Sequence, residues 1–303
     1  MPAKKLIHFI GIGGIGVSAI AKYHLGKGHI VSGSDLVSSE ITEDLKKRGA
    51  RIFIGKHDAR NLSNDTEAVV YSPAVKLDNP ELKKARELRI KILSYPEVLG
   101  ILTKNYFSIA ISGTHGKSTT TSMLGLLLVK AGFDPTVVVG TKVKEFGNSN
   151  FRMGKSRYLV IEACEHEESF LNYWPKITVI TNIEEDHLDY YKNLGNIIKA
   201  FKKFVDHLPK DGLLVLNEDD KNSCLIFKYA KEKKIKIAGF SLKQKGAGKL
   251  KKLLKIPGTH NIYNALAALT VARTLGISDR VSFKALSEYK GSWRRFEEKR
   301  ITI

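Results

Sequence analysis

Residues 109–120 read Ile109-Ala-Ile-Ser-Gly-Thr-His-Gly-Lys-Ser-Thr-Thr120, an apolar run that passes through two glycines into a helix-like segment. This order of strand, glycine-rich loop and helix is typical of a phosphate-binding loop. Gly113 and Gly116 let backbone amides approach phosphate oxygens. Lys117 can lie against the β- and γ-phosphates, and the Ser118 hydroxyl can coordinate Mg²⁺. The stretch therefore predicts binding of a nucleoside triphosphate such as ATP, with Mg²⁺.

The loop departs from the longer pattern G-x-x-x-x-G-K-[ST], because Ile111 stands where the first glycine would fall. A Gly-Lys-Ser tripeptide alone is often an ordinary helix start. Here it closes a buried-strand pattern and opens an apolar helix, and this context favours nucleotide binding. Thr114, His115 and Thr119 belong to the same loop and are expected to line the nucleotide site.

A second glycine cluster follows an apolar run at Leu6–Ile10. It is also a strand-turn-helix pattern, suited to a diphosphate at a helix N-terminus. Its glycines are Gly11, Gly13, Gly14 and Gly16. Asp35 ends the next strand pattern and suits a ribose. Alone, this pattern indicates a nicotinamide dehydrogenase, or glycines needed only for packing. Both loops together suggest a nucleotide-linked substrate that meets a nucleoside triphosphate.

Composition fits a chain of two α/β domains. The 303 residues are 43% hydrophobic and 27% charged, enough for two domains of about 150 residues each. Strand and helix patterns alternate, which predicts open, mostly parallel sheets. We expect a Rossmann-like domain at 1–103 and a central P-loop α/β domain at 104–293. The expected strands are Leu6–Ile10, Ile30–Ser34, Arg51–Ile54, Ala68–Tyr71, Pro135–Val139, Tyr158–Ile161, Ile177–Ile180, Gly212–Leu216 and Lys236–Phe240.

Charge and apolar content argue against several classes of partner. The formal net charge is +19, but the lysines are scattered and no nucleic-acid-binding motif accompanies them. No specific nucleic acid is therefore expected. No run approaches the roughly 20 apolar residues of a membrane span, and no signal peptide is evident. These features predict a cytoplasmic protein that binds no membrane.

Two cysteines provide neither a disulfide framework nor a C-x-x-C metal motif. The oligomeric state is not predicted.

Two further strand patterns end in candidate catalytic or metal-binding side chains. Tyr158–Ile161 runs into Glu162, and a strand ending near Asn182 leads to His187. Ligands collect at the carboxyl ends of parallel strands, so these endings are expected to converge with the phosphate loop. Glu162 is a suitable Mg²⁺ ligand, whereas His187 is less usual because Mg²⁺ prefers oxygen. The alternative for Glu162 is a helix N-cap or a surface acid. The alternative for His187 is an ordinary loop histidine.

Polar residues near the C-terminus are candidates for nucleotide contacts. Asn261 and Asn264 lie at the start of a helix pattern, and asparagine can read an adenine edge or simply cap a helix. Arg295 follows Arg294 and could bind phosphate or lie as surface charge.

The order of motifs resembles that of the Mur ligase family across essentially the whole chain. The matching segments are His8–Gly16, Gly33–Asp35, Tyr71–Ala74, Asp78–Glu81, Ser112–Ser118, Glu162–Glu165 with Ser169–Leu171, Thr181–Ile183 with Asp186–Asp189, Gly258–Asn261 with Asn264, and Gly291–Phe296.

This resemblance implies an ATP-dependent ligase of peptidoglycan precursor synthesis that joins L-alanine to the carboxylate of UDP-N-acetylmuramate through an acyl phosphate. It implies that Lys117 stabilises the transferring phosphoryl group. Ser118, Glu162 and His187 would hold Mg²⁺, with His187 at a second metal or acyl-phosphate position. Asn261 and Asn264 would contact adenine, and Arg295 the phosphates. The UDP moiety would lie against Gly11, Gly13, Gly14, Gly16, Asp35 and Ser72.

The family also has a third α/β domain, and residues 294–303 correspond to the stub that leads to it. The resemblance therefore implies that these 303 residues bind the UDP-sugar but ligate poorly, because closure of that domain completes the site. Three alternative functions remain open. The first is that of a ligase that attaches a preformed peptide to the same sugar nucleotide. The others are a nucleotide-binding module without catalysis and the dehydrogenase.

Overall fold

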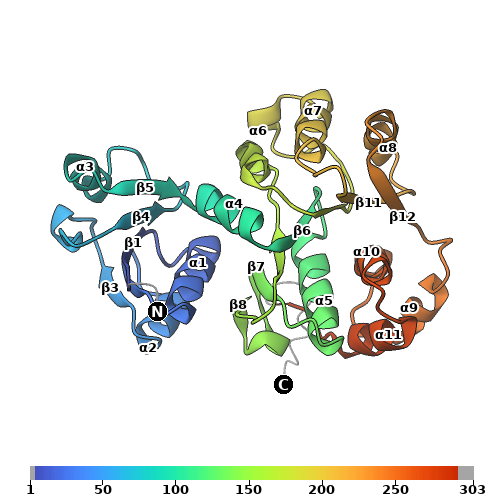
Figure 1. Ribbon diagram of the computed structural model, residues 1–303, viewed down its shortest axis with the longest axis horizontal. Coiled ribbons are helices and arrows are strands. Elements are labelled where there is room, and N and C mark those ends of the chain that lie inside the picture. The colour runs from blue at the N-terminus through green and yellow to red at the C-terminus, as the bar shows by residue number, and fades with distance from the viewer. Residues whose placement is uncertain (1–3, 293–303) are drawn as a thin grey trace, which may run out of the picture. The chain divides into compact units, whose positions relative to one another are not determined.

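The computed structural model describes residues 4–292, which divide into two compact units between Ile101 and Leu102 (Figure 1). The first unit contains a five-stranded sheet in the order β3-β2-β1-β4-β5, with every pair parallel. Its strands are β1 (Leu6–Ile10), β2 (Ile30–Asp35), β3 (Arg51–Ile54), β4 (Ala68–Tyr71) and β5 (Lys91–Ser94). This is the parallel Rossmann-like arrangement that the alternating pattern predicts.

Two helices of the first unit, α2 and α3, begin at side chains that accept hydrogen bonds from backbone amides of the first turn. Ser39 and Thr42 form a capping box at the start of α2, and Asn79 accepts from the first turn of α3, which has Pro80 at its first position. The helices of this unit are α1 (Ile15–Gly26), α2 (Glu40–Lys47), the short 3₁₀ helix η1 (Ala59–Asn61), α3 (Pro80–Glu87) and α4 (Tyr95–Asn105), which contains the division between the units.

A fully buried carboxylate, Glu81, joins three parts of the first unit. Its Oε2 lies 2.9 Å from His8 Nε2 and accepts a hydrogen bond from Ser34 Oγ at 2.6 Å. Its Oε1 accepts from Asn61 Nδ2 at 2.8 Å. Burial raises the pKa of Glu81, but the hydrogen bonds with His8, Ser34 and Asn61 outweigh that effect and lower it to about 2. The ionised carboxylate thus ties α3 to β1 and β2.

The second unit contains a seven-stranded sheet in the order β12-β11-β10-β6-β9-β7-β8. Only the β7–β8 pair is antiparallel. The strands are β6 (Phe107–Ser112), β7 (Thr136–Val143), β8 (Ser149–Arg152), β9 (Tyr158–Glu162), β10 (Ile177–Ile180), β11 (Leu213–Asn217) and β12 (Lys236–Phe240). Because β6 lies between β9 and β10, the ends of these three strands are neighbours.

Two helices, α5 and α10, form the centre of the second core and pack against each other in Figure 1. Leu124, Leu127 and Leu128 of α5 are fully buried, and each such side chain contributes about 1.5–3 kcal/mol. The helices are α5 (Lys117–Lys130), α6 (Leu188–Tyr191), α7 (Leu194–Val205), α8 (Ser223–Glu232), α9 (Ala247–Leu253), α10 (Thr259–Thr274) and α11 (Asp279–Glu288), with 3₁₀ segments η2 (Lys144–Phe146) and η3 (His166–Asn172).

All nine of these expected strands are present, with small differences at their ends, and so is the strand expected before the phosphate loop, which is β6. Two strands were not expected, β5 and β8. Lys91–Ser94 is a short edge strand that is not fully buried, and Ser149–Arg152 carries little apolar pattern. The division at Ile101 and Leu102 falls near the expected boundary at 103, but inside a continuous helix. Among residues 4–292, no helix is both long and apolar enough to cross a bilayer.

We predict that Glu81→Gln destabilises the first unit by about 1–3 kcal/mol at pH 7, because buried donors lose their charged acceptor. The pKa of Glu81 is lowered from 4.5 to about 2, so ionisation stabilises the fold above about pH 4.5, and this contribution is lost as the pH falls towards 2. Hydrogen exchange of β1 and β2, expressed as protection factors, measures the effect.

The difference between E81Q and the native chain should shrink from pH 7 to pH 3. Glu87→Gln, at the exposed end of the same helix, should change protection little at either pH. An E81Q effect of equal size at both pH values would contradict the assignment.

Candidate functional site

The loop between β6 and α5 requires glycine at two positions. Gly113 has φ +130° and Gly116 has φ +84°, both in the left-handed region. A Cβ on Gly113 would lie 2.1 Å from Thr181 Oγ1, and one on Gly116 would lie 2.2 Å from Asn264 Oδ1. Backbone conformation and close packing therefore each exclude a side chain. The loop lies directly against the end of β10 and against α10.

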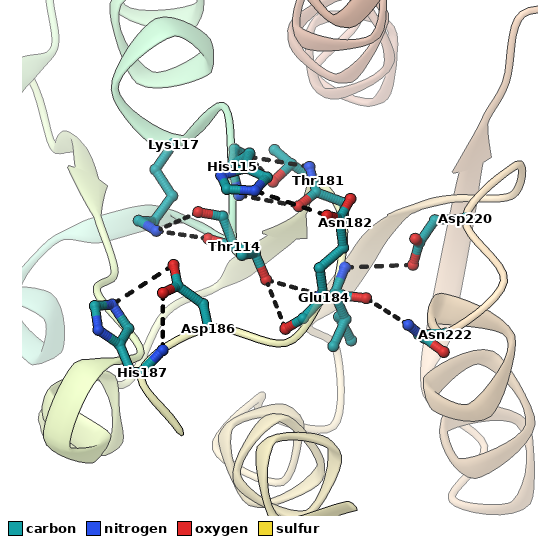
Figure 2. A network of polar contacts seen from close by, with 12 residues as sticks. Thr114, His115, Lys117, Thr181, Asn182, Glu184, Asp186, His187, Asp220 and Asn222 are labelled. Atoms are coloured by element: carbon teal, nitrogen blue, oxygen red, sulfur yellow. Dashed lines mark hydrogen bonds and ion pairs between the residues drawn. The ribbon is translucent and has the colours of Figure 1, made fainter. Parts of the chain in front are cut away.

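Hydrogen bonds fasten this loop to the chain that follows β10 (Figure 2). Thr181 Oγ1 donates to His115 O at 2.6 Å, and His115 N donates to Asn182 Oδ1 at 2.9 Å. Thr114 N donates to Asn182 O at 3.0 Å, and Glu184 N donates to Thr114 Oγ1 at 2.9 Å. The loop is thus held in shape by protein contacts. The predicted residues Thr114 and His115 contribute to that shape through their backbones and the Thr114 hydroxyl.

Polar side chains at and after the end of β11 form hydrogen bonds with the segment that follows β10. Asn217 Nδ2 donates to Thr181 O at 3.1 Å. Ile183 N donates to Asp220 Oδ2 at 3.3 Å, and Asn222 Nδ2 donates to Ile183 O at 2.7 Å. Sequence reasoning did not single out Asn217, Asp220 or Asn222, since each looks like an ordinary turn residue until β11 is known to pair with β10.

Lys117 opens α5 and folds back over the loop. Its Nζ donates to Gly113 O at 2.7 Å, to Thr114 O at 3.0 Å and to Glu165 Oε1 at 3.0 Å. The ammonium therefore lies beside the loop backbone, where the phosphates would enter. Ser118 and Thr119 follow in the first turn of the helix and are buried.

Glu162 ends β9, opposite Ile111 of β6. Its Oε1 accepts a hydrogen bond from Gly140 N at 2.6 Å. A Cβ on Gly140 would lie 2.8 Å from Glu162 Oε2, so the carboxylate passes close to the backbone of β7 at this glycine. The structure thus places Glu162 at the expected edge of the sheet, with one oxygen bonded to the neighbouring strand.

His187 begins α6 and lies with two carboxylates. Ligand atoms of Glu165, Asp186 and His187 are all within 4.8 Å of one another. His187 Nε2 lies 3.9 Å from Asp186 Oδ2, as Figure 2 shows. Glu162, which was expected to converge on the same edge of the sheet as His187, is not a member of this group, whereas Glu165 is. The sequence did offer a signal, since Glu165 and Asp186 lie in segments that follow β9 and β10.

Asn261 and Asn264 lie in a buried polar chain that joins α10 to α5. Asn261 Nδ2 donates to Pro257 O at 2.6 Å, and Asn264 Nδ2 donates to Asn261 Oδ1 at 3.2 Å. Asn264 Oδ1 accepts from Thr120 Oγ1 at 3.2 Å. Both amides are buried and already bonded to protein, so an adenine would have to reach the donor or acceptor capacity that these bonds leave. Arg295 lies outside the described residues.

The first unit has a cavity of about 630 Å³ beside its glycine turn. Five of the predicted residues line it: Gly11, Gly13, Gly14, Asp35 and Ser72. His57 and Lys76 line it as well, and neither was predicted. Gly16 is not among the lining residues. A Cβ there would lie 2.7 Å from the Tyr95 ring, so this glycine serves close packing.

Asp35 stabilises the glycine turn in addition to lining the cavity. Its Oδ2 accepts a hydrogen bond from Gly13 N at 2.7 Å. The Asp35 carboxylate therefore accepts a hydrogen bond from the backbone just before α1, at the end of the helix where the dipole favours negative charge. The cavity is therefore lined by the glycine turn, by the Asp35 carboxylate and by the Lys76 cation.

Comparison with known protein families identifies both units. Residues 6–107 match the Mur ligase family catalytic domain, and residues 111–272 match the Mur ligase middle domain. Two similar relatives are UDP-N-acetylmuramate–L-alanine ligases. The one from Caldanaerobacter subterraneus subsp. tengcongensis is 42% identical over 319 residues, covering 98% of this chain and 68% of the relative. The one from Clostridium tetani is 43% identical over 317 residues, covering 98% and 69%.

Solved structures show the same similarity. The UDP-N-acetylmuramate–alanine ligase from Thermotoga maritima matches with a TM-score of 0.82 and 31% identity, covering 97% of this chain and 70% of that one. The UDP-N-acetylmuramate:L-alanyl-gamma-D-glutamyl-meso-diaminopimelate ligase from Neisseria meningitides matches with a TM-score of 0.83 and 25% identity, covering 96% and 100%. By both of its matched domains and by relatives above 40% identity, this chain belongs to the Mur ligase family.

Proposed function

We propose that this chain acts in the ATP-dependent ligation of L-alanine to the carboxylate of UDP-N-acetylmuramate, a step of peptidoglycan precursor synthesis. The observation that carries the proposal is the position of Lys117 on a glycine loop at the junction of β6, β9 and β10. The names of the relatives at 42–44% identity supply the substrates. The cytoplasmic location stays a prediction.

The proposed reaction has two bond exchanges. An oxygen of the substrate carboxylate attacks the γ-phosphorus of ATP, and ADP leaves with the electron pair of the broken P–O bond. The L-alanine amine then attacks the acyl-phosphate carbonyl, and inorganic phosphate leaves from the tetrahedral intermediate. Such phosphoryl transfer depends mostly on positioning and charge stabilisation. Lys117 would neutralise charge on the transferring group, and the Gly113–Gly116 backbone would hold the phosphates.

We assign Mg²⁺ to Ser118 and Glu162, and we place His187 at a second metal or acyl-phosphate position. The donor types support this assignment, since a hydroxyl and a carboxylate suit Mg²⁺ and the three positions follow neighbouring strands. A cation there would offset negative charge on the phosphates. Glu162 would have to share the oxygen that now accepts from Gly140 N or use its other one.

The remaining contacts divide between the two units. We propose that residues 1–103 bind the UDP moiety through the cavity lined by Gly11, Gly13, Gly14, Asp35 and Ser72, with Gly16 keeping the first helix close to Tyr95. Residues 104–293 would bind ATP. Thr114, His115 and Thr119 would shape that site, Asn261 and Asn264 would lie near the adenine, and Arg295 would contact phosphate.

A second candidate is a ligase that adds a preformed peptide to the same sugar nucleotide. The Neisseria structure with its TM-score of 0.83 favours it. Sequence identity favours L-alanine, because that structure is 25% identical and the alanine ligases are 42–44% identical. Comparing L-alanine with the tripeptide as amine acceptor separates the two. The dehydrogenase alternative loses its basis, because the N-terminal glycine turn lies inside a matched Mur ligase domain.

We predict that UDP-N-acetylmuramate binds the cavity of the first unit and that Lys76→Ala weakens this binding roughly three- to fivefold. An exposed ion pair contributes up to about 1 kcal/mol, and Lys76 lines the cavity where the diphosphate would lie. Calorimetric titration measures the dissociation constant.

Lys83→Ala is the matched control, since Lys83 is exposed on α3 and does not line the cavity. The same weakening in both variants would point to general charge attraction. Failure of the native chain to bind the sugar nucleotide would overturn the proposed function of the first unit.

We predict that Lys117→Met lowers Mg-ATP affinity at least about tenfold, because a charged hydrogen bond to phosphate contributes about 1.5–3 kcal/mol. Lys130→Met, at the other end of the same helix, should leave affinity unchanged. Calorimetric titration with Mg-ATP tests both variants, and unchanged hydrogen exchange of the second unit checks their folding. Equal Mg-ATP binding by K117M and the native chain would remove Lys117 from the site.

A further inference from the structure

A second large cavity, of about 760 Å³, lies between α9 and α11 of the second unit. These helices pack against each other at the far end of α5 from the phosphate loop (Figure 1). Glu288 of α11 pairs with Lys130, the last residue of α5, at 2.6 Å. Because α5 has 14 residues, each rising about 1.5 Å, its two ends are roughly 20 Å apart. The proposed ligation therefore gives this cavity no role.

The cavity is lined by four cationic side chains, which are Lys245, Lys249, Arg280 and Lys284. None of the four forms an ion pair with a carboxylate among residues 4–292. Asp279 also lines the cavity, but Arg273 already donates two hydrogen bonds to its carboxylate, at 2.8 and 2.9 Å. These bonds hold the pKa of Asp279 below its usual value, and the nearby ammoniums of Lys245 and Lys249 lower it further. The positive charge of the cavity is thus left without an internal counterion.

Phe283 fixes the position of one of these cations. Lys249 Nζ lies 4.5 Å from the centre of the Phe283 ring, a cation–π contact that leaves its protons available to an anion. The ring itself is buried, and a Cβ on Gly246 would lie 2.8 Å from its Cζ. Gly246 has φ +109°, which favours glycine, so the backbone can pass this close to the ring. The ammonium therefore rests on a packed surface rather than at the tip of a free side chain.

These features suit a small ligand that carries several negative charges. Positive groups gathered in a concavity reinforce one another's field and raise the local concentration of anions. The guanidinium of Arg280 can bind two oxygens of a phosphate at once, and the lysine ammoniums can take others. Four cations exceed the charge of a single phosphate group, and the volume lies within the range of small-molecule sites.

We propose that the cavity between α9 and α11 binds a small anion with two or more phosphate groups, at a site separate from those for ATP and UDP-N-acetylmuramate. The four cations would contact the phosphates. The chemistry that they recognise is a phosphate chain, which can be free or part of a nucleoside triphosphate.

Titration of the isotopically labelled 303-residue chain with inorganic tripolyphosphate in EDTA, followed by nuclear magnetic resonance, tests the site. The backbone amides of Gly246 and Gly248 report this cavity, and those of Gly113 and Gly116 report the phosphate loop separately. Four exposed ion pairs, each changing the affinity up to about fivefold, predict saturation at Gly246 and Gly248 with a dissociation constant of about 1 mM or below. Signals at these two glycines that do not shift would overturn the inference, whatever the phosphate loop does.

Combining Lys249→Met with Arg280→Gln should weaken tripolyphosphate binding at Gly246 and Gly248 at least about tenfold, because two of the four cations are removed. The matched control combines Lys251→Met with Lys252→Met. It removes the same charge from exposed positions of α9 outside the cavity and should change the affinity less than about twofold. Equal weakening in both would show attraction by the net charge alone and overturn the inference. Lys284→Met, expected to weaken binding about threefold, tests the site independently if the first combination folds poorly.

GTP in place of tripolyphosphate separates the two sources of a phosphate chain, with the same glycine amides as reporters. Equal affinity would support a site for the phosphate chain itself. Tighter binding of GTP, lost when Lys249 and Arg280 are both replaced, would support a site for a nucleoside triphosphate. Binding of GTP that shifts only Gly113 and Gly116, together with no response to tripolyphosphate at Gly246 and Gly248, would contradict both.

Discussion

The close approach of two glycines to their neighbours is the constraint on which the site depends. Gly113 lies against Thr181 and Gly116 against Asn264, at distances that exclude any Cβ. These contacts join the end of β6 to β10 on one side and to α10 on the other. The loop therefore keeps its shape through packing and hydrogen bonds rather than through a ligand. Preorganisation of this kind lowers the cost of binding a phosphate chain.

Lys117 balances charge beside this loop. Its ammonium bonds to the Glu165 carboxylate, which lies 48 positions along the sequence. The first unit also contains a buried carboxylate, but its surroundings differ. There the Glu81 carboxylate is held at both oxygens by hydrogen bonds and serves stability. Both oxygens of Glu81 are satisfied, whereas Glu165 Oε2 has no hydrogen-bond partner among residues 4–292.

The sequence predicted the fold well because buried parallel strands produce continuous apolar runs between glycine turns. It failed at β5 and β8, which are edge strands without such runs. Within the site, the loop was predictable because glycines and Lys117 are adjacent in sequence. Glu165 was not distinguished from Glu162, since Glu162 ends β9, Glu165 follows it closely, and only the path of the chain after the strand decides which one reaches His187. Likewise, a sequence cannot show that Asn261 and Asn264 bond to each other.

The most direct test of the account is to trap the acyl phosphate. The chain is incubated with UDP-N-acetylmuramate, Mg-ATP and hydroxylamine, whose nitrogen attacks an acyl phosphate and expels inorganic phosphate to leave a hydroxamate. Mass spectrometry then searches for the hydroxamate of the sugar nucleotide. The account predicts a hydroxamate that requires ATP and is lost in K117M. A native chain that binds both substrates and forms no hydroxamate would contradict it.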